Sequence, residues 1–217
     1  MDKEWGSVVE AKINIVSRLK KELDKGARGT YGIGTVTDPY QPAEKEYELT
    51  RGCLVQLKRA KARVSILTKS DLVLRDFDIL SDWDGSEVGI SIGCSDDNVA
   101  SVTEPGACPP SRRFEALARL SEAGITNYLM AAPILPGIGD SGEAFEDLVQ
   151  RAAEAGVGRI IWDVFNPKPL ATARLKLALS SQGFTLRNPS GRSDADAVRA
   201  LLAHQCTIRW IELMDAF

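Results

Sequence analysis

The sequence predicts an α/β fold with a parallel sheet, and the order of its segments carries this prediction. Five strand–loop–helix units follow one another between residues 30 and 183, at spacings of roughly 30 residues, a pattern typical of parallel strands joined by right-handed crossovers. Near-continuous apolar strands such as YLMAAPIL need cover on both faces. An open doubly wound sheet and part of a barrel both meet these requirements.

The expected elements alternate along the chain. A strand over SVVEAKIN leads into a helix that ends at Gly26. The five repeated strands are expected at residues 30–36, 63–70, 87–93, 125–135 and 159–165. The first of their helices is expected after the Pro-rich loop TDPYQPAE and is marked by Tyr47, Leu54 and Leu57. The other four are expected at 71–80, from Phe114 to Gly124, at 143–156 and at 170–183.

The C-terminal residues extend this pattern. Residues 192–205 predict a helix with Ser193 as its N-cap, and residues 206–213 predict a strand. We therefore divide the chain into a β/α unit at 1–183 and an extension at 184–217 that packs on it.

Composition excludes several classes of protein. Of the 217 residues, 44% are hydrophobic and 26% are charged, which excludes disorder. A net charge of −3 gives no general attraction to nucleic acid or to an anionic membrane. The N-terminal residues MDKEWGSVVEAK lack the apolar core of a signal peptide, and no window approaches ~18 uninterrupted apolar residues. We expect a cytoplasmic protein without membrane partners.

The cysteines predict no metal site. Cys53, Cys94, Cys108 and Cys206 are scattered, and no CxxC pair is present. Structural zinc needs short paired spacings and iron–sulfur clusters need a local run of cysteines. Four reduced thiols and a structural His204 are the favoured interpretation.

Side chains capable of chemistry follow the repeated strands. Asp38, between Thr37 and Pro39, is a fixed carboxylate for an amine, a ribose or a proton, and it is equally suited to a turn. Lys69 ends the next strand, where it can bind a carboxylate or phosphate, form a Schiff base, or simply lie at the surface. Asp96 and Asp97 suggest a cation site only weakly, and a helix cap or solvated turn is favoured.

Two later loops also have alternative interpretations. Arg112 and Arg113 oppose the dipole of the helix that they begin, so they predict an anion ligand or an ion pair with Glu104 or Glu115. The loop APILPGIGDSG leaves backbone groups open to a ligand, or is a tight turn that starts a helix.

The order and wording of these segments resemble a known family. GTVTDPYQPAEKEYELTR, ILTKSDLVLRDFDIL, VGISIG, EPGACPPSRRFEALARLSEAGI and APILPGIGD, across roughly residues 5 to 170, resemble the radical S-adenosylmethionine (radical SAM) proteins related to spore photoproduct lyase, often labelled DNA repair photolyase-like. The resemblance implies a partial TIM-type (β/α)6 barrel. It also implies a 4Fe–4S cluster held by a CxxxCxxC loop, an electron donor, and reductive cleavage of S-adenosylmethionine to a 5′-deoxyadenosyl radical.

The resemblance also implies ligand contacts. Thr37 and Asp38 would meet the methionine amino group, and Lys69 and Ser91 would hold its carboxylate and the ribose. Arg113 is a further candidate for the carboxylate, and Ile134 for a backbone contact to adenine. No catalytic residue is assigned.

The sequence departs from the family before Trp5. In the relatives the cysteine loop precedes the segment that matches WGSVVEAKIN, and here only four residues precede Trp5. We therefore expect the first strand and the cluster cysteines to be missing from this chain. None of its four cysteines takes their place, so the resemblance implies S-adenosylmethionine but no cluster here.

Three functions remain open at this point. The first is a radical SAM enzyme domain that is inactive in this chain alone. The second is a cluster-less module that binds S-adenosylmethionine or a nucleotide, and the third is a lyase with a Schiff base on Lys69. The sequence does not identify the substrate, and nucleic acid is one class that the resemblance suggests. The basic run from Arg51 to Arg63 could contact a phosphate backbone, but such runs are more typical of solvated surface. An unpaired strand edge also predicts self-association through residues 8–14 or 31–37.

Overall fold

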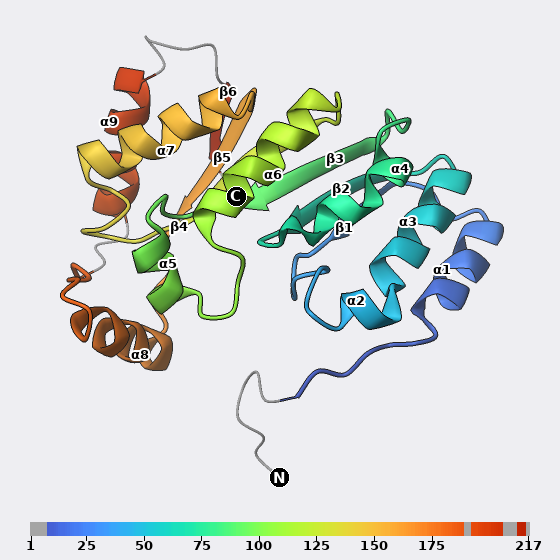
Figure 1. Cartoon of the computed structure of the whole chain (residues 1–217), viewed down its shortest axis with the longest axis horizontal. Coiled ribbons are helices and arrows are strands. Elements are labelled where there is room, and N and C mark those ends of the chain that lie inside the picture. Colours follow the sequence, from blue (N-terminus) through green and yellow to red (C-terminus); the bar gives the residue numbers. More distant parts are fainter. Residues whose placement is uncertain (1–7, 189–191, 206–211, 216–217) are drawn as a thin grey trace.

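A computed structural model describes residues 8–188, 192–205 and 212–215. Six strands form one sheet in the order β1-β2-β3-β4-β5-β6, and all five neighbouring pairs are parallel (Figure 1). They are β1 (Thr30–Ile33), β2 (Arg63–Thr68), β3 (Ser86–Ser91), β4 (Asn127–Ile134), β5 (Arg159–Val164) and β6 (Glu212–Asp215). A doubly wound sheet reverses its strand order at a switch point, and this order has no reversal. The open sheet is therefore of the partial-barrel type.

One helix, α1 (Ile15–Asp24), precedes β1, and the other helices occupy the crossovers between the strands. They are α2 (Glu44–Tyr47), α3 (Leu49–Arg59), the 3-10 helix η1 (Asp71–Asp76), α4 (Phe77–Leu80), α5 (Asp97–Thr103), α6 (Pro110–Glu122), α7 (Gly142–Glu154), α8 (Pro169–Ser180) and α9 (Arg192–Gln205). The carboxyl ends of the parallel strands all meet one edge of the sheet, here called the carboxyl edge.

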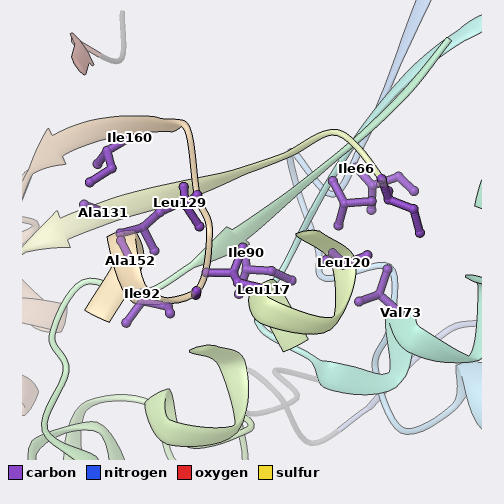
Figure 2. Close-up of a cluster of buried hydrophobic side chains, with 14 of the residues drawn as sticks. Ile66, Val73, Ile90, Ile92, Leu117, Leu120, Leu129, Ala131, Ala152 and Ile160 are labelled. Atoms are coloured by element: carbon purple, nitrogen blue, oxygen red, sulfur yellow. The ribbon is translucent and has the colours of Figure 1, made fainter. Parts of the chain in front are cut away.

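The main core lies between one face of the sheet and these helices (Figure 2). Alternation along β2 buries Val64 and Ile66, whereas Arg63 and Ser65 on the other face stay more accessible. Leu117 and Leu120 of α6 pack with Ile90 in the same core. Each such fully buried side chain stabilises the fold by about 1.5–3 kcal/mol.

Helix α8 is packed differently. None of its residues belongs to the main core. Leu179 forms a separate small cluster with Leu135 and Leu186, against which Leu175 and Val102 of α5 also pack. Because Leu135 follows β4 directly, α8 and α5 cover part of the carboxyl edge (Figure 1).

The structure confirms most predicted elements and corrects three predictions. The predicted strand over residues 8–14 is wrong: Val8, Val9 and Ile13 are 47%, 58% and 74% exposed and form no strand. A β-branched pair favours a strand only where it packs on a half-buried sheet surface. Helix α9 begins at Arg192, one residue before the predicted N-cap Ser193, and most of the predicted strand over 206–213 lies outside the described residues. Helix α5 occupies a segment for which no helix was predicted.

Candidate functional site

Two cavities open at the carboxyl edge. The larger, of about 680 Å³, lies between the loops that follow β1 and β2 and the segment before α6. Its walls include Asp38, Tyr40, Gln41, Pro42, Lys45, Lys69, Ser70, Asp71, Leu72, Arg75, Gly106, Ala107, Cys108, Pro109 and Arg112. The smaller, of about 180 Å³, is lined by Lys69, Gly93, Cys94, Ala100, Thr103, Glu104, Pro133, Leu135, Phe165 and Leu175. Lys69 lies in the walls of both.

Asp38 joins the ends of the first two strands. Its Oδ1 accepts a hydrogen bond from the Thr68 hydroxyl at 2.6 Å and its Oδ2 accepts one from the Lys69 backbone N–H at 2.7 Å. Its Oδ1 also accepts a hydrogen bond from the Tyr40 backbone N–H at 2.9 Å, as in an Asx turn. The turn interpretation is therefore confirmed, and the same carboxylate lines the larger cavity.

Lys69 is held in an ion pair. Its Nζ lies 2.5 Å from Glu104 Oε1, and the lysine side chain is 36% exposed. Burial of Glu104 opposes its ionisation, but Lys69 and Arg113 outweigh this effect and hold the pKa of Glu104 below its ordinary value. The pair brings together residues 35 positions apart, from the end of β2 and the end of α5.

Arg113 completes this cluster from α6. Its Nη2 lies 2.7 Å from Glu104 Oε2, an ion pair without hydrogen-bond geometry at that nitrogen. Nη1 donates to the Ser91 carbonyl at 2.9 Å, and Nε donates to the Cys108 carbonyl. The side chain is only 1% exposed. The predicted ion pair with Glu104 is thus present, and Arg112 pairs instead with Asp71.

The other predicted ligand residues lie outside the cavity walls. The Ser91 hydroxyl donates to the Ala132 carbonyl at 3.0 Å, and Ile134 is buried with its carbonyl accepting from the Phe165 N–H at 3.1 Å. Thr37 is exposed. Of the six predicted residues, the structure therefore brings Asp38 and Lys69 to a common cavity.

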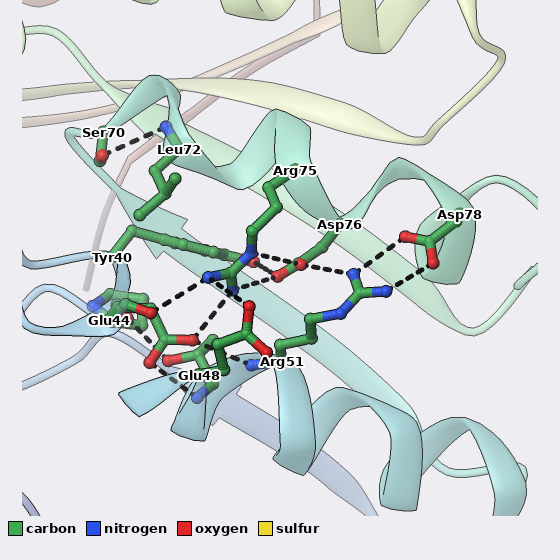
Figure 3. A network of polar contacts seen from close by, with 11 residues as sticks. Tyr40, Glu44, Glu48, Arg51, Ser70, Leu72, Arg75, Asp76 and Asp78 are labelled. Carbon is green, nitrogen blue, oxygen red and sulfur yellow. Dashed lines mark hydrogen bonds and ion pairs between the residues drawn. The ribbon is translucent and has the colours of Figure 1, made fainter. Parts of the chain in front are cut away.

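A buried ion network supports the larger cavity, and the sequence did not reveal it (Figure 3). Asp76 is fully buried and accepts hydrogen bonds from the Tyr40 hydroxyl at 3.0 Å, from Arg51 Nη1 at 2.8 Å and from Arg75 Nε at 2.9 Å. Arg75 also donates to Glu44 Oε1 at 2.9 Å. Burial, and then the charge of Asp76, raise the pKa of Tyr40. The network locks the segment TDPYQPAE onto TKSDLVLRD.

The described part of the chain holds no metal-type cluster. Within residues 8–188, 192–205 and 212–215, no three His, Cys, Asp or Glu side chains converge to hold an ion. Cys53, Cys94 and Cys108 are free thiols; burial raises the pKa of Cys53 to about 11 and also raises that of Cys94. These three thiols do not fit a 4Fe–4S cluster.

The Asp pair after β3 has structural contacts. Asp96 caps α5 by accepting from the Asn98 N–H at 2.7 Å, and Asp97 accepts from the Ser111 hydroxyl at 2.6 Å. The cap interpretation is confirmed. Over the same described ranges, we find no helix with the length and apolar character needed to cross a bilayer.

Solved structures of other proteins share the fold of this chain. The chain aligns in three dimensions with SuiB of Streptococcus suis bound to S-adenosylmethionine (TM-score 0.64, 16% identity, 99% of this chain and 45% of that one). It aligns with the Escherichia coli coproporphyrinogen III oxidase HemN, a radical SAM enzyme (TM-score 0.57, 15% identity, 92% and 48%). The fold is that of radical SAM enzymes. Spore photoproduct lyase complexed with a dinucleoside spore photoproduct shares it as well (TM-score 0.64, 14% identity, 96% and 68%).

Sequence relatives are uncharacterized proteins. One from Methanocaldococcus jannaschii is 39% identical over 137 residues, covering 63% of this chain and 51% of its own length. One from Mycobacterium tuberculosis is 32% identical over 158 residues, covering 70% and 46%. The chain thus spans about half the length of these relatives. No protein-family model matches it.

Proposed function

We propose that the chain supplies the S-adenosylmethionine-binding part of a radical SAM-type domain, with the larger cavity as the binding site. The observation that carries this proposal is that Asp38 and Lys69 both line one cavity at the carboxyl edge. The methionine part of S-adenosylmethionine bears an ammonium and a carboxylate, so an acidic and a basic side chain complement it. SuiB, which shares this fold, has been solved bound to S-adenosylmethionine, and this supports the choice of ligand.

The size and chemistry of the cavity fit such a ligand. A volume of about 680 Å³ lies within the range of roughly 300–1,000 Å³ for small-molecule sites. Leu72, Pro109 and Ala107 offer apolar contact for an adenosyl group, while Gln41 and Ser70 offer hydrogen bonds. The ion network behind Tyr40 and Arg75 keeps this wall rigid, which limits the ordering cost of binding.

The roles of the chain's own residues follow from their contacts. In a complete radical SAM site, S-adenosylmethionine bound to a reduced 4Fe–4S cluster supplies a 5′-deoxyadenosyl radical. Here Asp38 would accept hydrogen bonds from the ligand's ammonium while keeping its turn, and Lys69 would donate to its carboxylate.

Calorimetric titration with S-adenosylmethionine tests the proposal. We expect binding by the purified chain and about a tenfold or greater loss of affinity in Lys69→Met, since a hydrogen bond to a charged group contributes about 1.5–3 kcal/mol. Lys25→Met is the matched control, because Lys25 forms an exposed ion pair with Glu22 at 2.8 Å on α1. No binding, or equal losses in both variants, would refute the proposal.

A second candidate is a module that binds the same ligand without cleaving it, and the lack of convergence among the described cysteines favours it. Anaerobic reconstitution with iron and sulfide separates the two. Visible absorbance of an iron–sulfur cluster together with 5′-deoxyadenosine would support the enzyme, and binding without either would support the module. The Lys69 lyase is disfavoured because the Lys69 Nζ is held by Glu104 Oε1 at 2.5 Å and is not free to attack a carbonyl carbon. The lesion-bound neighbour supports nucleic acid as the first substrate class to test.

A further inference from the structure

The ion pair between Lys69 and Glu104 lies at the junction of the two cavities. Lys69 lines both cavities and Glu104 lines the smaller one. The ammonium and the carboxylate are 2.5 Å apart. Any anionic group that approaches Lys69 from the larger cavity therefore meets a cation that already has a counter-ion.

Glu104 has a second cation that does not depend on Lys69. Arg113 Nη2 lies 2.7 Å from the other carboxylate oxygen, Oε2. The Arg113 side chain is 1% exposed and is fixed by the carbonyls of Ser91 and Cys108. Glu104 is thus held from its buried side and stays paired if Lys69 turns away. An uncompensated buried charge, the usual penalty for breaking such a pair, does not arise.

Lys69 is the most exposed member of this cluster. Its side chain is 36% exposed, compared with 18% for Glu104 and 1% for Arg113. A lysine carries its charge on a flexible four-carbon stem, so the ammonium can move while the backbone stays fixed. The Lys69 backbone N–H remains tied to Asp38 at 2.7 Å.

We propose that Glu104 is an internal counter-ion that competes with the carboxylate of a bound ligand for Lys69. This inference rests on the proposed function and names a specificity-determining residue for it. In the free protein Lys69 pairs with Glu104; in the complex Lys69 pairs with the ligand and Glu104 keeps Arg113. Ions that bind Lys69 weakly do not displace Glu104, so the exchange selects for ligands with a well-placed carboxylate.

Two ligands that differ only in that carboxylate test the exchange. S-adenosylmethionine and its decarboxylated form both carry the adenosyl, sulfonium and ammonium groups. Effects of Glu104 on the cationic groups are common to the two ligands and cancel in the ratio of their dissociation constants. In Glu104→Gln we expect this ratio to change about two- to fivefold in favour of S-adenosylmethionine, the range for a partly exposed ion pair.

Glu87→Gln is the matched control. Glu87 on β3 forms a comparable partly exposed ion pair with Arg159 at 2.7 Å, and it lines neither cavity. We expect its ratio to equal that of the parent chain. A ratio in Glu104→Gln that is unchanged, or that moves toward the decarboxylated ligand, would overturn the inference while leaving the proposed function intact.

Carbon-13 NMR of the Glu104 carboxyl in the unsubstituted chain gives a readout that needs no variant. Saturation with S-adenosylmethionine should raise the pKa of Glu104, because Lys69 leaves it, and the decarboxylated ligand should not. Equal titration curves with both ligands would overturn the exchange. Binding of neither ligand would overturn the proposed function, and this inference with it.

Discussion

Replacement of Asp76 by Asn tests whether the buried ion network supports the carboxyl edge. The carboxylate is fully buried and compensates Arg51 and Arg75, which are 28% and 22% exposed. Breaking a fully buried pair costs about 3–5 kcal/mol. Both arginines keep contact with water and with a second carboxylate, which reduces the expected loss in free energy of unfolding to about 2–3 kcal/mol.

Urea denaturation at pH 7 measures this loss from the midpoint and the slope of the transition. Asp78→Asn is the matched control, because Asp78 pairs with the same Arg51 at 2.6 Å but is 62% exposed. We expect a loss of about 0–1 kcal/mol there. Equal losses in the two variants, or a loss below about 1 kcal/mol for Asp76→Asn, would show that burial of the network contributes little to stability.

Three further predictions concern stability and assembly. At Gly34 the backbone φ is +107°, and an added Cβ would lie 2.1 Å from the Leu67 carbonyl oxygen. Gly34→Ala should therefore lower the free energy of unfolding, measured in urea, by about 2 kcal/mol or more, and a loss below about 0.5 kcal/mol would contradict this prediction. Because the pKa of Glu104 is lower in the folded chain, the unfolded chain takes up the proton first as the pH falls, so the ion pairs of Glu104 stabilise the fold fully above about pH 4.5 and less at lower pH. The difference in free energy of unfolding between the parent chain and Glu104→Gln should therefore become smaller from pH 6 to pH 3, and a constant difference would refute this prediction. Concentration-dependent sedimentation is expected from pairing at the edge of β1, and a monomer at all concentrations would count against it.

Local chemistry explains what the sequence could predict. The repeated strands were located from runs of apolar residues, because these runs are visible in neighbouring residues. For Asp96 a helix cap was one of two favoured interpretations, beside a solvated turn. That Asp38 and Lys69 contact one ligand was implied by the resemblance, and both line the larger cavity at the edge where the ends of the parallel strands meet. Helix α5 was missed because DNVASVT is short and rich in residues with low helix propensity.

The contacts that define the site were beyond sequence reasoning. Glu44 and Arg75 are separated by 31 positions, and no periodicity links a carboxylate of one helix to a guanidinium of another. Arg113 was expected near a ligand or an acidic residue, yet its burial and its bonds to the carbonyls of Ser91 and Cys108 depend on how α6 docks on β3. The strand predicted over residues 8–14 is wrong for a different reason. The local pattern suits a strand, but among the described residues no neighbouring strand pairs with this segment.

The separate packing of α8 has a consequence for amide hydrogen exchange. Its cluster is built on Leu135, Leu179 and Leu186, apart from the core that holds the sheet to the other helices. A unit with few buried contacts can open without global unfolding. The amides of α8 should therefore exchange earlier than those of α6, and each local opening would uncover Leu175 and the smaller cavity that it lines.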